Sequence, residues 1–279
     1  MSQIELLLQQ DTWRFWDQSL SGKSRSALES FASDDLLCHL VGQQQSPATV
    51  RTWVHSQTVV LGIQDHRLPF VEDGQNFLRT QGYSPIVRNS GGLAVVLDEG
   101  VLNVSIILPE AKQAIDIPTG YEVMLAFVEL LFPEADGKIE AYEIIGSYCP
   151  GSYDLSIDGK KFAGISQRRL RQGIAVQVYL CIEGSGSERA ELIRRFYEIG
   201  IQGENTKFTY PDIKPEVMAS MNELLDTSFR VEDIVIRIQQ LLQQLSDTVI
   251  HQSVTPDEMD LYMFYMQRVV DRNKKMLEK

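Results

Sequence analysis

Residues 149–164 read CPGSYDLSIDGKKFAG, and this stretch decides how the middle of the chain folds. Its Asp-Gly pair at 158–159 stands between two runs of alternating apolar residues, which is the strongest short signal for a β-hairpin. A two-residue turn there sets the expected cross-strand pairs: Ile157 with Lys160, Ser156 with Lys161, and Leu155 with Phe162. The pairing places Leu155, Ile157 and Phe162 on a core face. The opposite face carries Asp154, Ser156, Lys161 and Ala163.

Cys149 begins this stretch within GSYCPGS at 146–152, a run of turn residues where a buried structural cysteine is unusual. A thiol on a loop becomes reactive when a nearby positive charge favours its thiolate. Lys161 follows twelve residues later on the predicted hairpin and can supply that charge. We therefore predict that Cys149 is a nucleophile and that Lys161 activates it. The alternative for Lys161 is an exposed lysine in an ordinary hairpin.

The other two cysteines fit structural roles. Cys38 lies in a helical pattern of apolar residues, and Cys181 ends an apolar run typical of a buried strand. Free cysteines of this kind usually behave as small hydrophobic residues. The four histidines lack a recognisable catalytic neighbourhood, which disfavours a Cys-His protease.

Composition limits the class of protein. A chain of 279 residues with 43% hydrophobic content can bury one large core, or a core and a small appendage. The net charge of -12 argues against nucleic acid as the main partner. No apolar run approaches the roughly 18 residues of a membrane span, and the N-terminus has no signal-peptide pattern. Three cysteines without disulfide or zinc spacing suit a reducing compartment, so we expect a cytoplasmic protein without a metal site.

The pattern of periodicities divides the chain into two regions. Strands are expected at 50–54, 58–63, 93–97, 101–108, 138–145, 153–157, 161–168 and 173–182, the first two as neighbours, with helices at 69–81 and 121–132. After about residue 187 the pattern is helical, with helices at 188–199, 231–245 and 259–276. The polar stretch 200–212 is the candidate boundary. We predict a catalytic domain at 1–205 and a helical C-terminal extension at 206–279.

The loop RNSGG at 88–92 is a second candidate element of the site. Paired glycines permit positive φ angles and let a ligand approach the backbone closely. An ordinary hairpin turn is the alternative. The loop is not a phosphate loop, because no lysine follows at Walker spacing and no GxGxxG is present.

Two longer segments carry a resemblance to a known family. Residues 88–103, RNSGGLAVVLDEGVLN, resemble the acyl-binding loop and strands of the lipoate–protein ligase and octanoyltransferase superfamily. Residues 149–169 resemble its catalytic hairpin, and SPAT at 46–49 and VLGIQD at 60–65 fit as well. The resemblance covers most of residues 11–200. It implies an α+β catalytic domain like those of biotin and lipoate ligases, with a mixed β-sheet and flanking helices.

Within this superfamily, the chain closely resembles the amidotransferases that use the octanoylated glycine cleavage H protein as donor. Their acceptors are the lipoyl domains of oxo-acid dehydrogenase complexes. Leu97 stands where many relatives have a histidine, and Asn89 where they have a basic or bulky residue. These departures separate the chain from typical ATP-dependent ligases and from transferases that use octanoyl-acyl carrier protein.

The resemblance also implies a mechanism without a cofactor. Cys149 would attack the octanoyl amide and form a thioester, which splits one difficult exchange into two steps. The charge of Lys161 would favour the thiolate and stabilise the developing oxyanion. The residues implied to bind the acyl group are Arg88, Ser90, Gly91, Gly92, Asn103 and Gly164.

Basic residues near the predicted site suggest how an acidic carrier domain could dock. They are Lys160, Lys161, Arg168, Arg169 and Arg171. Local charge of this kind can outweigh net repulsion between two acidic proteins, because salt screens the long-range interaction. A solvated strand edge is the alternative.

Two other functions remain open. An ATP-dependent lipoate or octanoate–protein ligase would use the same fold but activate the free acid as an acyl-adenylate, without needing Cys149. A non-catalytic acyl sensor that binds carrier domains would keep the pocket and dispense with thiolate chemistry. The position of Cys149 opposite Lys161 favours catalysis over the sensor.

Overall fold

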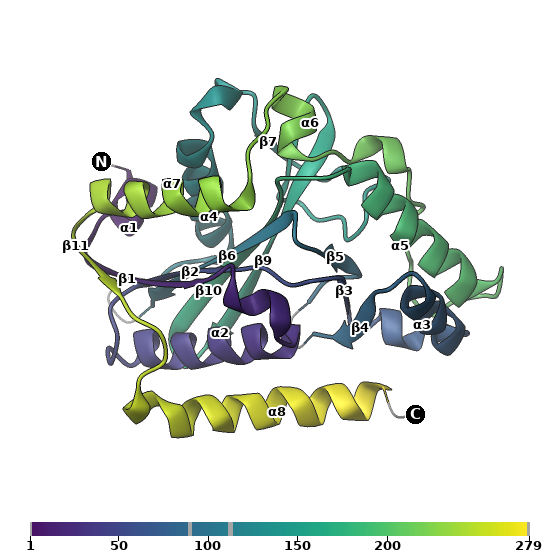
Figure 1. Cartoon of the computed structure of the whole chain (residues 1–279), viewed down its shortest axis with the longest axis horizontal. Coiled ribbons are helices and arrows are strands. Elements are labelled where there is room, and N and C mark those ends of the chain that lie inside the picture. The colour runs from purple at the N-terminus through teal and green to yellow at the C-terminus, as the bar shows by residue number, and fades with distance from the viewer. Residues whose placement is uncertain (1, 89–90, 111–113, 278–279) are drawn as a thin grey trace.

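The computed structural model of the chain describes residues 2–88, 91–110 and 114–277. Its centre is a sheet of eight strands in the order β11-β1-β2-β6-β10-β9-β8-β7. A smaller sheet has the order β4-β3-β5. Both sheets mix parallel and antiparallel pairs, and helices flank them (Figure 1). The predicted α+β fold with a mixed sheet and flanking helices is confirmed.

The bounds of the elements follow. The large sheet contains β1 (Gln10–Gln18), β2 (Thr49–Trp53), β6 (Val101–Pro109), β7 (Glu140–Ala141), β8 (Asp154–Ile157), β9 (Lys160–Leu170), β10 (Gly173–Cys181) and β11 (Ser246–His251). The small sheet contains β3 (Thr58–Leu61), β4 (Ser84–Val87) and β5 (Val95–Leu97). The helices are α1 (Gln3–Leu8), α2 (Ala27–Gly42), α3 (Val71–Thr80), α4 (Ile117–Leu131), α5 (Gly186–Ile201), α6 (Met221–Leu225), α7 (Val231–Gln244) and α8 (Met259–Leu277). Five 3₁₀ turns are also described, among them η2 (Asp65–Arg67).

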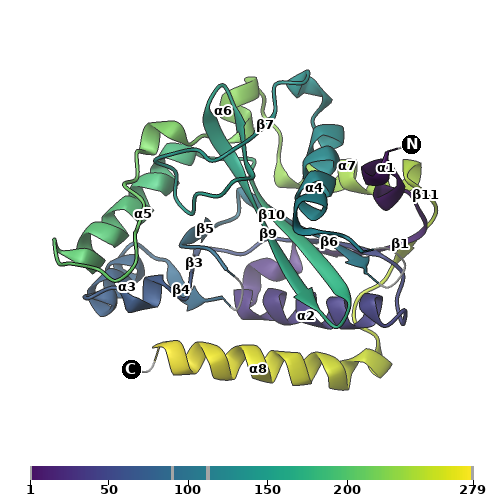
Figure 2. The same ribbon diagram turned by 180° about the vertical axis from the view of Figure 1, so that it is seen from behind.

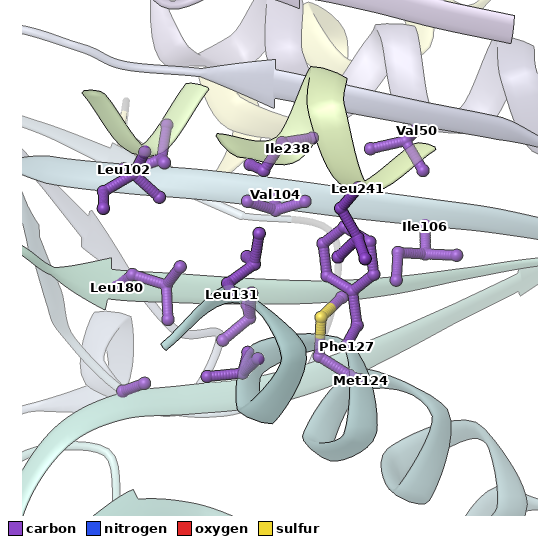
Figure 3. Packing of buried hydrophobic residues seen from close by; sticks show 14 of the residues in the cluster. Val50, Leu102, Val104, Ile106, Met124, Phe127, Leu131, Leu180, Ile238 and Leu241 are labelled. Carbon is purple, nitrogen blue, oxygen red and sulfur yellow. The ribbon is translucent and has the colours of Figure 1, made fainter. Parts of the chain in front are cut away.

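One face of the large sheet packs against α4 and α7. Figure 3 shows the core of this layer, with labelled side chains from β6, α4 and α7: Leu102, Val104, Ile106, Met124, Phe127, Leu131, Ile238 and Leu241. Successive side chains of a strand point to opposite faces. Asn103 and Ser105 of β6 therefore point to the other face, where they contact Trp53 and Asp34.

The opposite face of the sheet is covered by α2, and α8 packs on the outer side of α2 (Figures 1 and 2). Polar contacts tie α8 and the 3₁₀ turn just before it, η5 (Pro256–Glu258), in place. The carboxylate of Glu258 accepts hydrogen bonds at 2.7 and 2.9 Å from the guanidinium of Arg14, and the Tyr265 hydroxyl lies 2.9 Å from Nδ1 of His39. None of the described helices combines the length and apolarity that crossing a membrane requires.

The prediction that the strands at 50–54 and 58–63 are neighbours is wrong, because β2 and β3 lie in different sheets. The reason is His55, which is buried between them. Its ring nitrogens lie 2.9 Å from the Ser30 hydroxyl and 2.9 Å from the carbonyl oxygen of Gly22. These contacts hold the connecting segment inside the protein and direct the chain into the small sheet.

The hairpin register is correct next to the turn and wrong beyond it. Asp158 and Gly159 both have positive φ, 51° and 73°, as a type I′ turn requires. The expected pairs of Ile157 with Lys160 and Ser156 with Lys161 form, but a register shift then pairs Leu155 with Ala163 instead of Phe162. This bulge lets Phe162 and Ala163 both enter the core cluster, so Ala163 does not share the face of Lys161.

The predicted helical extension contains one strand that the sequence pattern does not reveal. β11 lies parallel to β1 at the edge of the large sheet. Helix α7, which was predicted, buries Ile234, Ile238 and Leu242 in the same core as the sheet. The division of the chain at residue 205 stays a prediction.

Candidate functional site

Cys149 lies on the loop between β7 and β8, with a φ of 46°. Non-glycine residues rarely adopt this left-handed conformation, so surrounding contacts must maintain it. Lys161 supplies them. Its fully buried Nζ donates to the carbonyl oxygens of Tyr148 (2.9 Å) and Cys149 (3.0 Å) and lies 2.8 Å from Oδ1 of Asp154.

Among the residues that the structure describes, two N–H donors converge on the sulfur of Cys149. The backbone N–H of Leu93 donates at 3.2 Å, and Nη2 of Arg88 donates at 3.3 Å. The same Nη2 donates to the carbonyl oxygen of Leu93 at 2.7 Å, which fixes the guanidinium on the loop. Such donors can stabilise negative charge on sulfur. Arg88 is thus the cation placed at the sulfur, whereas Lys161 contacts the loop carbonyls and Asp154.

The glycine loop approaches this sulfur closely. Gly92 has a φ of 103°, and a Cβ there would lie 2.1 Å from Nη2 of Arg88 and 3.0 Å from the Cys149 sulfur. On its other side, a Cβ on Gly62 would lie 1.9 Å from the Gly92 carbonyl oxygen. Both conformation and space therefore require glycine at position 92. The alternative of an ordinary hairpin turn is wrong, because β4 and β5 are not neighbours in the small sheet.

A cavity of about 300 Å³ opens beside Cys149. The predicted site residues on its wall are Arg88, Gly91, Gly92, Asn103, Cys149 and Gly164. Lys161 is buried and supports the Cys149 loop. Ser90, the remaining predicted residue, lies outside the described residues, as does Asn89.

Most of the apolar wall comes from residues that were not predicted to bind the acyl group: Phe31, Trp53, Val60, Val95, Leu97, Ile165, Val178 and Tyr179. They belong to α2 and to strands of both sheets. No local spacing connects them, because the fold alone brings these segments together. An apolar lining with a few polar groups is typical of a site for a small apolar ligand.

Two of the predicted acyl-binding residues shape the wall through protein contacts. The side-chain amide of Asn103 donates to the Trp53 carbonyl oxygen at 3.2 Å. A Cβ on Gly164 would lie 2.7 Å from the ring of Tyr179, so glycine there lets this ring pack against the strand. These two positions therefore determine where Trp53 and Tyr179 stand around the cavity.

The arginines expected to form a free basic cluster are neutralised by acidic partners. Arg168 pairs with Asp35, with 2.7 Å between Nε and Oδ1, and Arg169 pairs with Glu110, with 2.6 Å between Nη1 and Oε1. The length of β9 carries both arginines along the strand toward these partners. Lys161 is fully buried, so its predicted place in the docking cluster is wrong. The part of the paired arginines in docking stays a prediction.

Burial keeps two cysteines and one histidine outside the site in their neutral forms. Burial raises the pKa of Cys38 well above its ordinary value and also raises that of Cys181. Burial lowers the pKa of His55 to about 4, so this ring is neutral. Within residues 2–88, 91–110 and 114–277, no three His, Cys, Asp or Glu side chains are placed to hold a metal ion.

Comparison with known proteins agrees with this geometry. The family model "Lipoyl protein ligase A/B catalytic domain" matches residues 26–244. The chain is 65% identical to an octanoyl-[GcvH]:protein N-octanoyltransferase of Lysinibacillus sphaericus (strain C3-41), over 99% of each chain. It is 56% identical to the protein of the same name from Anoxybacillus flavithermus (strain DSM 21510 / WK1), over 97% of this chain and 98% of that one. A crystal structure of lipoate-protein ligase A bound with ATP has the same fold, with a TM-score of 0.65 at 14% identity, covering 87% of this chain and 90% of that chain.

Proposed function

Because the chain belongs to the lipoyl protein ligase A/B catalytic-domain family and is an acyltransferase of protein lipoylation, we propose that Cys149 carries the transferred acyl group. The donor is the octanoylated glycine cleavage H protein, GcvH, which the names of the two relatives specify. The acceptors are lysines on lipoyl domains of oxo-acid dehydrogenase complexes. One observation carries the proposal: the N–H groups of Arg88 and Leu93 converge on the Cys149 sulfur beside an apolar cavity.

In the first step, the Cys149 sulfur attacks the carbonyl carbon of the octanoyl amide. The carbon–sulfur bond forms, the carbon–nitrogen bond breaks, and the donor lysine leaves as an amine that takes up the thiol proton. The Arg88 guanidinium and the Leu93 N–H stabilise negative charge on the sulfur before attack. They stabilise the same charge again when the thioester is cleaved and the sulfur leaves. The octanoyl chain occupies the apolar cavity, where each buried methylene contributes about 0.8 kcal/mol.

In the second step, the amine of an acceptor lysine attacks the thioester carbonyl. A new amide forms, and the thiol of Cys149 is regenerated with the proton that the amine loses. Lys161 supports both steps as a positioning residue, because it maintains the left-handed backbone at Cys149. We place the reaction in the cytoplasm, in keeping with three free cysteines.

The test is intact-mass analysis of the protein mixed with octanoylated H protein in the absence of any nucleotide. We expect a mass increase of one octanoyl group, located on Cys149, and its loss when a lipoyl domain is added. The Cys149→Ala variant should lack both the adduct and the transfer. The matched variants Cys38→Ala and Cys181→Ala should keep both, with stability losses of about 1–3 kcal/mol.

Three outcomes would reject the proposal. A strict requirement for ATP and magnesium would identify a ligase that makes an acyl-adenylate. Binding of the carrier without transfer would identify an acyl sensor. Turnover of the Cys149→Ala variant near the wild-type rate would remove the thioester from the mechanism.

A further inference from the structure

We infer that Asp65 and Tyr197 form a positioning pair that holds the backbone of residues 92–94 against the sulfur of Cys149. Asp65 lies on η2 and Tyr197 on α5, 132 residues apart in the sequence. Neither is among the described side chains that line the cavity. The inference rests on the proposed function, in which this sulfur receives the acyl group.

The contacts of the pair are fully buried. One carboxylate oxygen of Asp65 accepts a hydrogen bond from the Gly62 N–H at 2.7 Å, and the other accepts from the Tyr197 hydroxyl at 2.8 Å. The Tyr197 oxygen in turn accepts from the Ala94 N–H at 3.4 Å. Asp65 is 0% exposed and Tyr197 is 3% exposed. A buried carboxylate is tolerated only when it is hydrogen-bonded, so these donors fix its position.

The pair reaches the loop at two points, one on each side of Leu93. Gly62, which donates to Asp65, packs its backbone directly against Gly92, where no Cβ would fit. Ala94 is held through Tyr197. Leu93 lies between these two points, and its N–H donates to the Cys149 sulfur at 3.2 Å. Movement of either support would therefore change the direction of this N–H.

Electrostatics link the pair to the sulfur as well. Burial raises the pKa of Asp65 to about 6, while the Gly62 N–H, the Tyr197 hydroxyl and the charge of Arg88 act in the opposite direction. Near neutral pH the carboxylate is thus charged and close enough to Arg88 to interact with it. Arg88 is the cation at the Cys149 sulfur. Asp65 therefore affects both sulfur donors, one through the backbone and one through charge.

The substitution Tyr197→Phe tests the inference, because it keeps the ring and removes the oxygen that joins Asp65 to the Ala94 N–H. We expect iodoacetamide to label Cys149 about tenfold more slowly at pH 7, equivalent to about 1.4 kcal/mol in the barrier. Formation of the acyl-enzyme should slow by a similar factor. The KM for octanoylated H protein should stay near the wild-type value, since the surface that meets the carrier is unchanged.

Tyr210→Phe is the matched control. The two tyrosine rings lie 5.4 Å apart, but the Tyr210 hydroxyl donates to the Gln64 carbonyl oxygen at 2.8 Å. This variant should be labelled at the wild-type rate. Equal labelling rates for folded Tyr197→Phe and Tyr210→Phe would overturn the inference. If Tyr197→Phe does not fold, Asp65→Asn is measured in the same way, and an unchanged labelling rate again overturns it.

The labelling readout separates this inference from the proposed function. Alkylation by iodoacetamide requires no octanoyl donor. Slower labelling of Tyr197→Phe therefore supports the positioning pair even if wild-type protein transfers no octanoyl group. Conversely, normal transfer by wild-type protein leaves the inference to be decided by the variants alone.

Discussion

At Cys149, the backbone conformation and the chemistry of the sulfur depend on different cations. The guanidinium of Arg88 donates to the sulfur, whereas the ammonium of Lys161 donates to the carbonyl oxygens of Tyr148 and Cys149, on either side of the Cys149 α-carbon. Lys161 also faces the buried carboxylate of Asp154. The predicted importance of Lys161 thus has a physical basis in loop geometry, which the sequence alone could not distinguish from direct contact with the thiol.

Lys161→Gln should damage both stability and acylation, because it leaves the carboxylate of Asp154 buried without its cation. Removing one partner of a buried ion pair costs about 3–5 kcal/mol. Burial already raises the pKa of Asp154 while Lys161 lowers it, so loss of the lysine disfavours the charged form further. Thermal unfolding and the intact-mass time course of acylation measure the two effects. The exposed neighbour Lys160 is the control, and Lys160→Gln should behave as wild type in both assays. Wild-type acylation by Lys161→Gln would contradict the assigned role.

Asp65 should make stability depend on pH. Its pKa of about 6 in the folded protein exceeds the value of about 3.9 in an unfolded chain. The folded state therefore binds this proton more tightly than the unfolded chain does. The stabilisation of the folded state by this proton is fully present below about pH 4 and is lost as pH rises through about 6. Asp65→Asn cannot ionise and should not show this loss. Between pH 4 and pH 7, the wild-type protein should therefore lose about 2–3 kcal/mol of unfolding free energy relative to the variant, at about 1.4 kcal/mol per pKa unit.

Denaturant unfolding of both proteins at the two pH values measures this shift. Tyr197 and Tyr210, which face Asp65, have pKa values raised above the tested range, Tyr210 to about 12. Both proteins also contain Arg88, and His66 and Arg67 on the same turn as Asp65. The difference in stability between the two proteins therefore isolates the titration of Asp65. Parallel stability curves from pH 4 to pH 7 would show that the carboxylate does not titrate as its burial requires.

At the scale of the elements, strands and helices with a strong period could be predicted from the sequence. The alternation in β6 correctly separates Val104 and Ile106, in the core, from Asn103 and Ser105 on the other face. The helical periods of α7 and α8 are likewise confirmed. These predictions succeed because each depends only on which side chains share a face within one segment.

Pairing between segments could be predicted less well. The Asp-Gly turn determines the two pairs next to it, but the bulge at Phe162 depends on the space that the core offers. Strand β11 has mostly exposed side chains and pairs with β1 from more than 200 positions away, so its own sequence carries little strand signal. The same limit applies to the site. Cys149 was visible from its loop, whereas the contact of Asp65 with Tyr197 exists only in the fold.

For the molecule as a whole, the C-terminal third encloses the rest from several sides. Figure 1 shows α7 above the large sheet, β11 at its edge and α8 beneath α2. The connection between β11 and α8 is anchored by Arg14 of β1, which donates to the Gln252 and Ser253 carbonyl oxygens and to Glu258. Segments that share one core and one sheet should unfold together. The helical extension is therefore expected to stabilise the catalytic part that it covers.

The substitution Leu242→Ala in α7 tests this coupling, because the tryptophan side chains that report unfolding lie outside the extension. Leu242 is fully buried in the core that contains Trp13, and all three tryptophans lie at or before position 53. A buried Leu→Ala change costs about 2–5 kcal/mol. Tryptophan fluorescence and circular dichroism should therefore report the same lowered unfolding midpoint. Ile236→Ala, on the same helix at a side chain 52% exposed, should leave the midpoint nearly unchanged. A separate early transition in circular dichroism, with the fluorescence midpoint unmoved, would instead show that residues 206–279 unfold independently.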